Sequence, residues 1–302
     1  MSYGHKKQHT IPESYLKAWC DRKTPEGHEP YVWVISKDGQ KTKKKAPTNV
    51  FTETDFYTIK KIDGTRDLVL EHGLQQLESK FATVRRNTLE PMADISPEDR
   101  ITLCAFTAAM HARTKAQREH TRNQWTPILD MMKSMQSKSK TMTPEERDIL
   151  AAHTPPSSEE GGIRIEDVEN IVENPMQSML GLMVEVETPL LIALDMAVLH
   201  TQSVPGFITS DRPCVWFDPE AYKRPPYYRI PALMYESIEI TLPISPSYVL
   251  LLNRQGFNGY KATNKTIVDE FNRRIRFHCY EYLVASRNEQ DPYWFVVDPR
   301  KG

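Results

Sequence analysis

The sequence predicts an α+β fold in which a helical central region packs against a mixed or antiparallel sheet formed mainly by the C-terminal third. Two observations indicate this class. Between residues 67 and 194, apolar residues recur at three- and four-residue steps, as on the buried faces of helices. After residue 197, short β-branched and aromatic runs alternate with prolines, as in strands. A similar run at residues 31–35 suggests that N-terminal strands can join the C-terminal sheet.

The N-terminal elements follow from local signals. Pro12 stands near the start of a short apolar helical pattern. The Tyr-Val-Trp-Val-Ile run at 31–35 is typical of a strand and ends at a turn signal, Asp38-Gly39. In chain order, the expected elements are a turn and short helix over 9–20, a strand over 31–35, a solvated hairpin tip over 41–45, a second strand over 51–59 and a helix over 67–89.

The central helices begin at a strong start signal. Ser96 can cap a helix, Pro97 suits its first position, and two acidic residues follow in the first turn. We expect this helix to continue without a break to about residue 124. The elements expected after it are a polar stretch over 131–158 with one short helix over 143–153, a loop over 154–162 and helical residues over 165–194.

The C-terminal third carries strand patterns and one more helix. The expected strands cover 198–202, 206–210, 214–217, 238–242, 248–252, 282–285 and 294–297, and the expected helix covers 266–278. A chain of 302 residues can form one large domain, which we expect over 1–302. Its parts are an N-terminal turn, strands and helices (9–130), a variable insertion or linker (131–162) and a helix plus the C-terminal sheet (163–302).

Composition excludes several classes of protein. Lys+Arg 39 against Asp+Glu 40 give a net charge of -1, so any contact with nucleic acid requires a local basic patch. With Gly 12 in the whole chain, no glycine-rich phosphate loop is present, which excludes kinase and dehydrogenase classes. The apolar stretch at 189–199 contains Asp195 and is too short to span a bilayer. We expect a cytoplasmic protein without a membrane partner, because the N-terminus also lacks a secretory signal.

The cysteines indicate neither a metal site nor disulfides. Cys20, Cys104, Cys214 and Cys279 lie far apart, and none stands at a zinc-binding spacing from another cysteine or a histidine. We expect buried free thiols, no cofactor and no metal.

Several short signatures occur in a fixed order along the chain. They are His9-Thr10-Ile11-Pro12-Glu13-Ser14-Tyr15-Leu16, Asp55-Phe56-Tyr57-Thr58, Leu77-Glu78, His111-Ala112-Arg113-Thr114, Gly206-Phe207-Ile208-Thr209-Ser210-Asp211-Arg212-Pro213 and Leu242-Pro243-Ile244-Ser245-Pro246. Together they resemble the bacterial family called domain of unknown function 4238, from about residue 9 to residue 286. The family pattern usually has proline after the arginine and threonine, whereas here Lys115 takes that place. The resemblance implies candidate positions but no reaction, and a toxin or phage-defence role rests on family analogy alone.

His9, Glu78 and Arg113 are the first three catalytic candidates. An imidazole beside a proline turn can act as a general acid or base, or can brace the following helix. Arg113 lies on a largely apolar helix face, where a guanidinium either clamps a phosphate or forms a buried brace with a carboxylate, Glu78 or Asp211. Arg113 and His120, seven residues apart on the expected helix, are also similar to the motif of HEPN-type ribonucleases.

Ser210 and Asp211 complete the catalytic set. They stand where a strand ends in a turn, so their side chains can simply bond to their own backbone. Alternatively, Ser210 is a nucleophile that needs a neighbouring base, and Asp211 is a metal ligand, pairs with Arg113 or orients His9 or Arg113. No Gly-x-Ser-x-Gly elbow surrounds Ser210.

A basic aromatic stretch indicates a nucleic-acid-binding surface. Cations beside stacking rings are typical of proteins that bind single strands, although a proline-braced surface loop gives the same pattern. The residues are Lys223, Arg224, Tyr227, Tyr228 and Arg229. The lysine-rich run at 41–45 and the arginines at 273–276 can extend the same surface.

Two hypotheses of function remain open. In the first, the protein is a phosphodiester hydrolase acting on RNA or a nucleotide, with Arg113 neutralising the phosphate and His9 as acid or base. In the second, it is a non-enzymatic module that binds a protein or nucleic acid through the basic aromatic loop, and the polar motif residues form a structural network. An open cleft around His9, Arg113 and Asp211 favours the first, and a closed, mutually bonded set favours the second.

Overall fold

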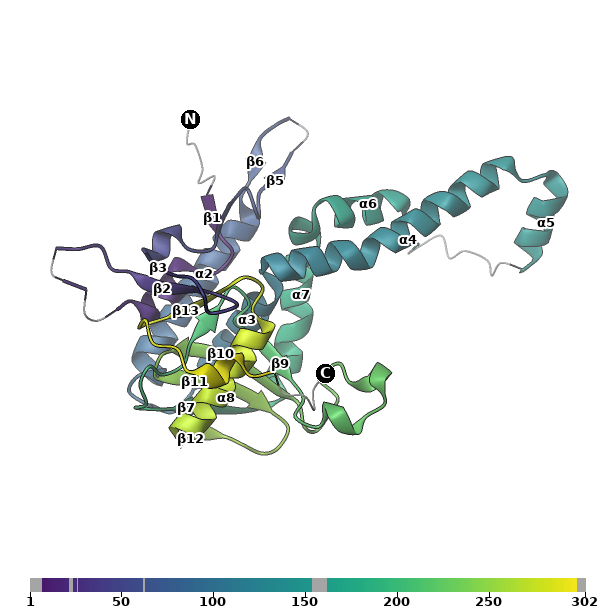
Figure 1. Ribbon diagram of the computed structural model, residues 1–302. Helices are drawn as coiled ribbons and strands as arrows, with labels where there is room; N and C mark the ends of the chain where they lie inside the picture. Colours follow the sequence, from purple (N-terminus) through teal and green to yellow (C-terminus); the bar gives the residue numbers. More distant parts are fainter. Residues whose placement is uncertain (1–6, 22–23, 26, 62, 154–161, 298–302) are drawn as a thin grey trace.

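A five-stranded mixed sheet with helices on both faces forms the centre of the molecule. The computed structural model describes residues 7–21, 24–25, 27–61, 63–153 and 162–297 (Figure 1). The strand order is β12-β7-β11-β10-β9, and β12 runs parallel to β7 while the other pairs are antiparallel. The strands are β7 (Asp195–His200), β9 (Val215–Phe217), β10 (Glu239–Ser245), β11 (Tyr248–Asn253) and β12 (Gly259–Ala262).

A four-stranded sheet joins the two ends of the chain. Its order is β3-β2-β13-β8, and β13 pairs with N-terminal β2 and with β8. The strands are β2 (Val32–Ser36), β3 (Thr42–Lys45), β8 (Thr209–Ser210) and β13 (Tyr282–Ala285). Two-stranded ribbons pair β1 (Lys7–His9) with β4 (Thr52–Thr54) and β5 (Ile59–Lys60) with β6 (Arg66–Asp67). The α+β class and the joining of N-terminal strands to a C-terminal sheet are therefore confirmed.

The helices fill the middle of the chain and one C-terminal segment. They are α1 (Glu13–Leu16), α2 (Val69–Val84), α3 (Pro97–Ala112), α4 (Lys115–Thr141), α5 (Pro144–His153), α6 (Ile165–Glu173), α7 (Pro175–Ile192) and α8 (Lys265–His278). Short turns are η1 (Lys17–Trp19), η2 (Pro47–Asn49), η3 (Arg85–Leu89, π-helical), η4 (Ala221–Lys223), η5 (Pro226–Tyr228) and η6 (Pro292–Phe295). Helix α4 projects from the body and carries α5 at its far end (Figure 1).

Several expectations about local structure are wrong. The strand expected over 51–59 consists of two short strands, β4 and β5, with a turn between them. The polar stretch expected from residue 131 begins inside α4, which continues to Thr141. The lysine run at 41–45 is not a hairpin tip, because the turn lies at Asp38-Gly39 and the lysines occupy the edge strand β3. Residues 294–297 form part of η6 and the segment after it rather than a strand. The predicted helix to residue 124 breaks at Arg113, since Thr114 caps α4 by accepting from the amide of Gln117 at 3.1 Å. Arg113 and His120 therefore do not share a helix. The predicted loop at 154–162 lies, except for its last residue, outside the described residues.

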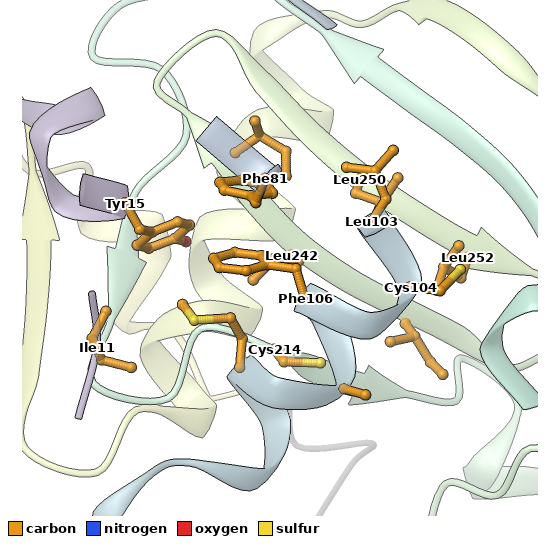
Figure 2. Close-up of a cluster of buried hydrophobic side chains, with 14 of the residues drawn as sticks. Ile11, Tyr15, Phe81, Leu103, Cys104, Phe106, Cys214, Leu242, Leu250 and Leu252 are labelled. Carbon is orange, nitrogen blue, oxygen red and sulfur yellow. The ribbon is translucent and has the colours of Figure 1, made fainter. Parts of the chain in front are cut away.

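One apolar core connects the N-terminal turn, α2, α3 and the central sheet. Phe81 of α2 stacks on Phe106 of α3 with ring centroids 3.7 Å apart, and Tyr15 lies beside both rings (Figure 2). Leu250 and Leu252 of β11 face this core, whereas Val249, on the other face of the sheet, packs against α8. Helix α8 therefore covers the outer face of the sheet.

Candidate functional site

Arg113 lies at the centre of a closed hydrogen-bond network. Its side chain is buried, and its Nη1 donates to Oε1 of Glu78 at 2.6 Å. Its Nη2 donates to the backbone carbonyl of His9 at 2.8 Å, and its Nε donates to the hydroxyl of Tyr57 at 3.2 Å. We call Tyr57, Glu78 and Arg113, with the His9 carbonyl, the motif network. It joins β1, the loop after β4, α2 and the end of α3.

The charges of the motif network fit a structural role. Burial opposes the charge of Arg113, but Tyr57 and Glu78 outweigh it and raise the pKa of the guanidinium above its ordinary value. Burial raises the pKa of Tyr57 to about 12, so its hydroxyl stays neutral. The network thus contains one buried ion pair whose guanidinium donates from all three of its nitrogens. A phosphate clamp needs donors that are free to turn to the ligand, whereas here each nitrogen already has a protein acceptor.

His9 contributes its carbonyl, not its ring, to the motif network. The imidazole is half-buried, and its Nε2 has no hydrogen-bond partner among the described residues. Burial lowers the pKa of His9, with a smaller opposing effect from Glu13, and the ring also bonds to the Pro47 carbonyl. His9 therefore lies against η2, and burial favours the neutral form of its ring.

Ser210 and Asp211 bond to nearby backbone. Ser210 is fully buried, and its Oγ accepts from the amide of Arg212 at 3.1 Å. Asp211 accepts from three successive amides, Tyr280, Glu281 and Tyr282, at 2.8, 2.6 and 2.9 Å. Burial raises the pKa of Asp211, and the three amides oppose that shift. These bonds tie the turn after β8 to the start of β13, and neither residue contacts Arg113 or His9.

A cavity of about 170 Å³ lies where three family motifs approach one another. Thr10, Lys115 and Asp211 line it, together with Lys45 and Glu281. His9, Glu78, Arg113 and Ser210 are not among its lining residues. The structure thus brings His9, Glu78 and Arg113 together and places Ser210 and Asp211 at a separate turn.

The basic aromatic stretch lies on a loop between β9 and β10, residues 218–237, which we call the tyrosine loop. Its cations are bound within the loop. Lys223 pairs with Glu220 at 2.7 Å, and Arg224 pairs with Asp218 and lies 3.8 Å from the Tyr235 ring centroid. Arg229 donates from Nε to the Arg224 carbonyl at 3.0 Å.

The rings and aliphatic side chains of the tyrosine loop face outward. Tyr227 is 93% exposed, and four more large apolar side chains are more than half exposed. These four are Tyr222, Tyr228, Ile230 and Met234. The loop projects from the body as a green segment on the side opposite β3 (Figure 1). The lysines of β3 and the tyrosine loop therefore do not form one surface.

Sequence reasoning missed the spaces around α8. A cavity of about 1030 Å³ lies between α8 and the outer face of the central sheet, with Leu199, Leu251 and Phe271 among its apolar lining. Arg273 and Arg274 line it as well, each bonded to Glu270. The clustering of charged residues along 270–274 was visible in the sequence. The cavity itself was not, because the side chains of β7 and β11 that face α8 come from segments far away along the chain.

The described ranges contain no candidate metal centre and no membrane-spanning helix. No three His, Cys, Asp or Glu side chains within them lie close enough together to hold a metal ion. None of the helices described is both long and apolar enough to cross a bilayer. The four cysteines are free thiols in the structure.

The motif positions can now be compared with known families. Residues 7–289 match the family described as protein of unknown function (DUF4238). The chain belongs to this family. No curated protein and no solved structure matches it.

For this DUF4238 member, the motif residues lie at contacts between distant segments. Arg113 bonds to β1 and α2, and Asp211 bonds to the start of β13. Lys115 stands at the first position of α4, a position that proline would also suit.

Proposed function

We propose that the protein is a binding module that recognises a protein partner through the tyrosine loop, while the polar motif residues stabilise the scaffold. The observation that carries this proposal is the exposure of five large apolar side chains on one loop. Exposed apolar groups gathered in this way are typical of interaction surfaces, and tyrosine is enriched among residues that dominate binding energy.

The charge of the loop favours a protein partner over a nucleic acid. Residues 218–237 contain three basic and three acidic residues, so their net charge is zero. Lys223 and Arg224 each pair with a carboxylate of the same loop. Nucleic-acid affinity depends mostly on cations that neutralise phosphates, and these cations are already neutralised.

The arrangement of the motif residues supports the binding module over the hydrolase. A hydrolase needs a guanidinium, an acid or base and a substrate in one water-accessible site. Arg113 is buried with all three nitrogens bonded, and Ser210 and Asp211 lie at a separate turn. In the described part of the chain, the hydrolase candidates are thus divided between two places, which favours the binding module.

Site-specific photo-crosslinking tests the proposal. A benzophenone amino acid replaces Tyr227 in one sample and Tyr280, an exposed tyrosine outside the loop, in the other. We expect position 227 alone to give a discrete product with a second protein, and Ile230→Glu in the same chain to abolish it. Products with nucleic acid, identical products from both positions, or no product at position 227 would overturn the proposal.

The captured partner then allows a quantitative test. With purified components, Ile230→Glu is expected to raise the Kd for the partner at least tenfold. This is on the order of the effect of replacing a buried residue in an interface. Ile149→Glu is the matched control, because Ile149 is exposed on α5 and lies outside the loop. Equal effects of the two substitutions would show that the loop does not form the contact.

A further inference from the structure

A second, smaller cavity lies at the base of the tyrosine loop, beside the C-terminal end of α8. Its volume is about 230 Å³. Trp216 of β9, Tyr222 of the loop and Phe277 of α8 contribute rings to its lining. A cavity of this size with aromatic walls fits one planar ring system, because flat ligands stack against such side chains.

The same cavity is bordered by positive charge. Arg229 and Arg274 line it, and the terminal nitrogens of Arg229 have no partner among the described residues. Arg274 lies 3.8 Å from the Phe217 ring centroid and is bound by Glu239 and Glu270. The one carboxylate among the described lining residues is Asp218, whose side chain is fully buried and paired with Arg224. A ligand in the cavity therefore meets the rings and the terminal nitrogens of Arg229, while the charges of the other two lining arginines, Arg273 and Arg274, are already offset by Glu239 and Glu270.

His278, the last residue of α8, also lines the cavity, and the pKa of its ring depends on the charges around the cavity. Burial, followed by the charges of Arg212, Lys37 and Arg274, lowers the pKa of His278 to about 4. The charged groups that act on this ring come from the turn after β8, the turn after β2 and α8 itself, and all are positive. Burial, the larger cause, disfavours a charge of either sign at this position, and the three neighbouring cations further disfavour an added proton.

We propose that this cavity binds a planar aromatic anion, whose ring lies among Trp216, Tyr222 and Phe277 and whose carboxylate or phosphate meets Arg229 and Arg274. The cavity shares Tyr222 with the exposed side chains of the tyrosine loop, whereas Tyr227, Ile230 and Met234 do not line it, so binding of a small ligand is tested separately from binding of a protein partner. The proposal assigns the chain a small-molecule site in addition to its interaction surface.

Calorimetric titration with a matched pair of ligands tests the proposal. The probes are 2-naphthoate and its neutral analogue 2-naphthamide, which share the ring system and differ in charge. We expect 2-naphthoate to bind at least tenfold more tightly than 2-naphthamide. This difference is on the order of the free energy of one charge-assisted hydrogen bond. Equal affinities, or no saturable binding of 2-naphthoate, would overturn the proposal.

Two exposed positions separate the contribution of charge from that of stacking. Arg229→Gln should weaken 2-naphthoate about tenfold and leave 2-naphthamide unchanged, whereas Phe277→Ala should weaken both ligands. Lys223→Gln removes the same charge from the same loop outside the cavity and is the control. A loss with Lys223→Gln as large as that with Arg229→Gln would reduce the effect to general electrostatics and contradict the assigned site.

The ring of His278 gives a second, independent readout. A bound anion stabilises the imidazolium, so saturating 2-naphthoate should raise the pKa of His278 in an NMR titration. Saturating 2-naphthamide is the control. A His278 pKa that is the same with both ligands would contradict binding beside α8, even if 2-naphthoate binds elsewhere.

Discussion

Arg113 carries a charge that cannot be removed, in a position that water does not reach. Such a group persists only when carboxylates and carbonyls accept its hydrogen bonds, and here Glu78, Tyr57 and the His9 carbonyl do so. Glu270 performs a comparable task near the surface, where it accepts from both Arg273 and Arg274. Single polar residues in this molecule therefore act mainly by holding segments in place.

Glu270 predicts a defined dependence of stability on pH. Burial raises the pKa of this carboxyl, but hydrogen bonds from Arg273 and Arg274 and their charges outweigh burial and lower it from 4.5 to about 2. Because the folded-state pKa is depressed, the contribution is complete above the unfolded pKa and is lost as the pH falls through the folded one. Because the carboxyl is only half-buried and solvent screens its ion pairs, we expect the shift to contribute about 1–2 kcal/mol to the free energy of unfolding.

Urea denaturation at a series of pH values measures this contribution. Between about pH 5 and pH 2, the unmodified protein should lose about 1–2 kcal/mol more stability than Glu270→Gln. Glu185→Gln, at an exposed position inside α7, is the control and should follow the unmodified protein. Parallel curves for Glu270→Gln and the unmodified protein would show that the ion pairs contribute nothing.

Only part of the site was predictable from single residues. The apolar face around Arg113 indicates a buried brace, and Glu78 was one of its two expected partners. Tyr57 and the His9 carbonyl were not predictable as partners, because a sequence shows neither where a backbone carbonyl points nor which distant hydroxyl reaches it. The exposure of Ile230 and Met234 was equally hidden, since isolated apolar residues in a loop are usually buried by other segments.

The elements of the fold depend on a few backbone positions. Gly206 adopts a positive φ of +81°, and a Cβ there would lie 2.2 Å from the Pro246 carbonyl oxygen. Its own carbonyl accepts from Nδ2 of Asn272 at 2.9 Å, which links the segment before β8 to α8. No other residue can adopt this conformation without strain.

A pair of glycine substitutions tests this requirement. Gly206→Ala should lower the free energy of unfolding by at least about 1–3 kcal/mol, because strain adds to the clash with Pro246. Gly181→Ala, in α7 with no atom near the added Cβ, should instead raise it by roughly 1 kcal/mol. Equal effects of the two substitutions in urea denaturation would contradict the conformational argument.

Elements were predictable where local chemistry determines them. The strong start at Ser96 and Pro97 is confirmed, and so is the strand over 31–35 to within one residue. The break at Arg113 was not predictable, because no glycine or proline marks it and the cap at Thr114 has the same side chain as many residues inside helices. Strand β12 was missed because its residues, Gly-Tyr-Lys-Ala, show no clear alternation.

The whole molecule combines segments that are remote along the chain. The joining of N-terminal and C-terminal strands was predictable, since strand patterns at both ends flank the helical middle. The separation of β3 from the tyrosine loop was not, because composition does not place basic segments on faces of the folded molecule (Figure 1).

This separation predicts weak, non-specific behaviour toward nucleic acid. In fluorescence anisotropy with a labelled single strand, replacing Lys223 and Arg229 together with Gln should leave the affinity for the strand unchanged within about twofold. The cations of β3 and of the rest of the surface, which attract phosphates without specificity, remain in place in this variant. Lys43→Gln with Lys44→Gln is the matched double substitution on β3. Binding that weakens at least tenfold between low and moderate salt and disappears in the loop variant would favour a nucleic-acid partner.

The central claim is that the family motifs build the scaffold, and a double-mutant cycle on Glu78 and Arg113 tests it most directly. The free energy of unfolding is measured by urea denaturation for the unmodified protein, Glu78→Gln, Arg113→Leu and the double variant. We predict that Arg113→Leu alone costs about 3 kcal/mol, since it leaves Glu78 without its partner, and that the coupling energy lies between about 1 and 3 kcal/mol. A coupling energy near zero, with Arg113→Leu as stable as the unmodified protein, would contradict the account and return Arg113 to the list of catalytic candidates.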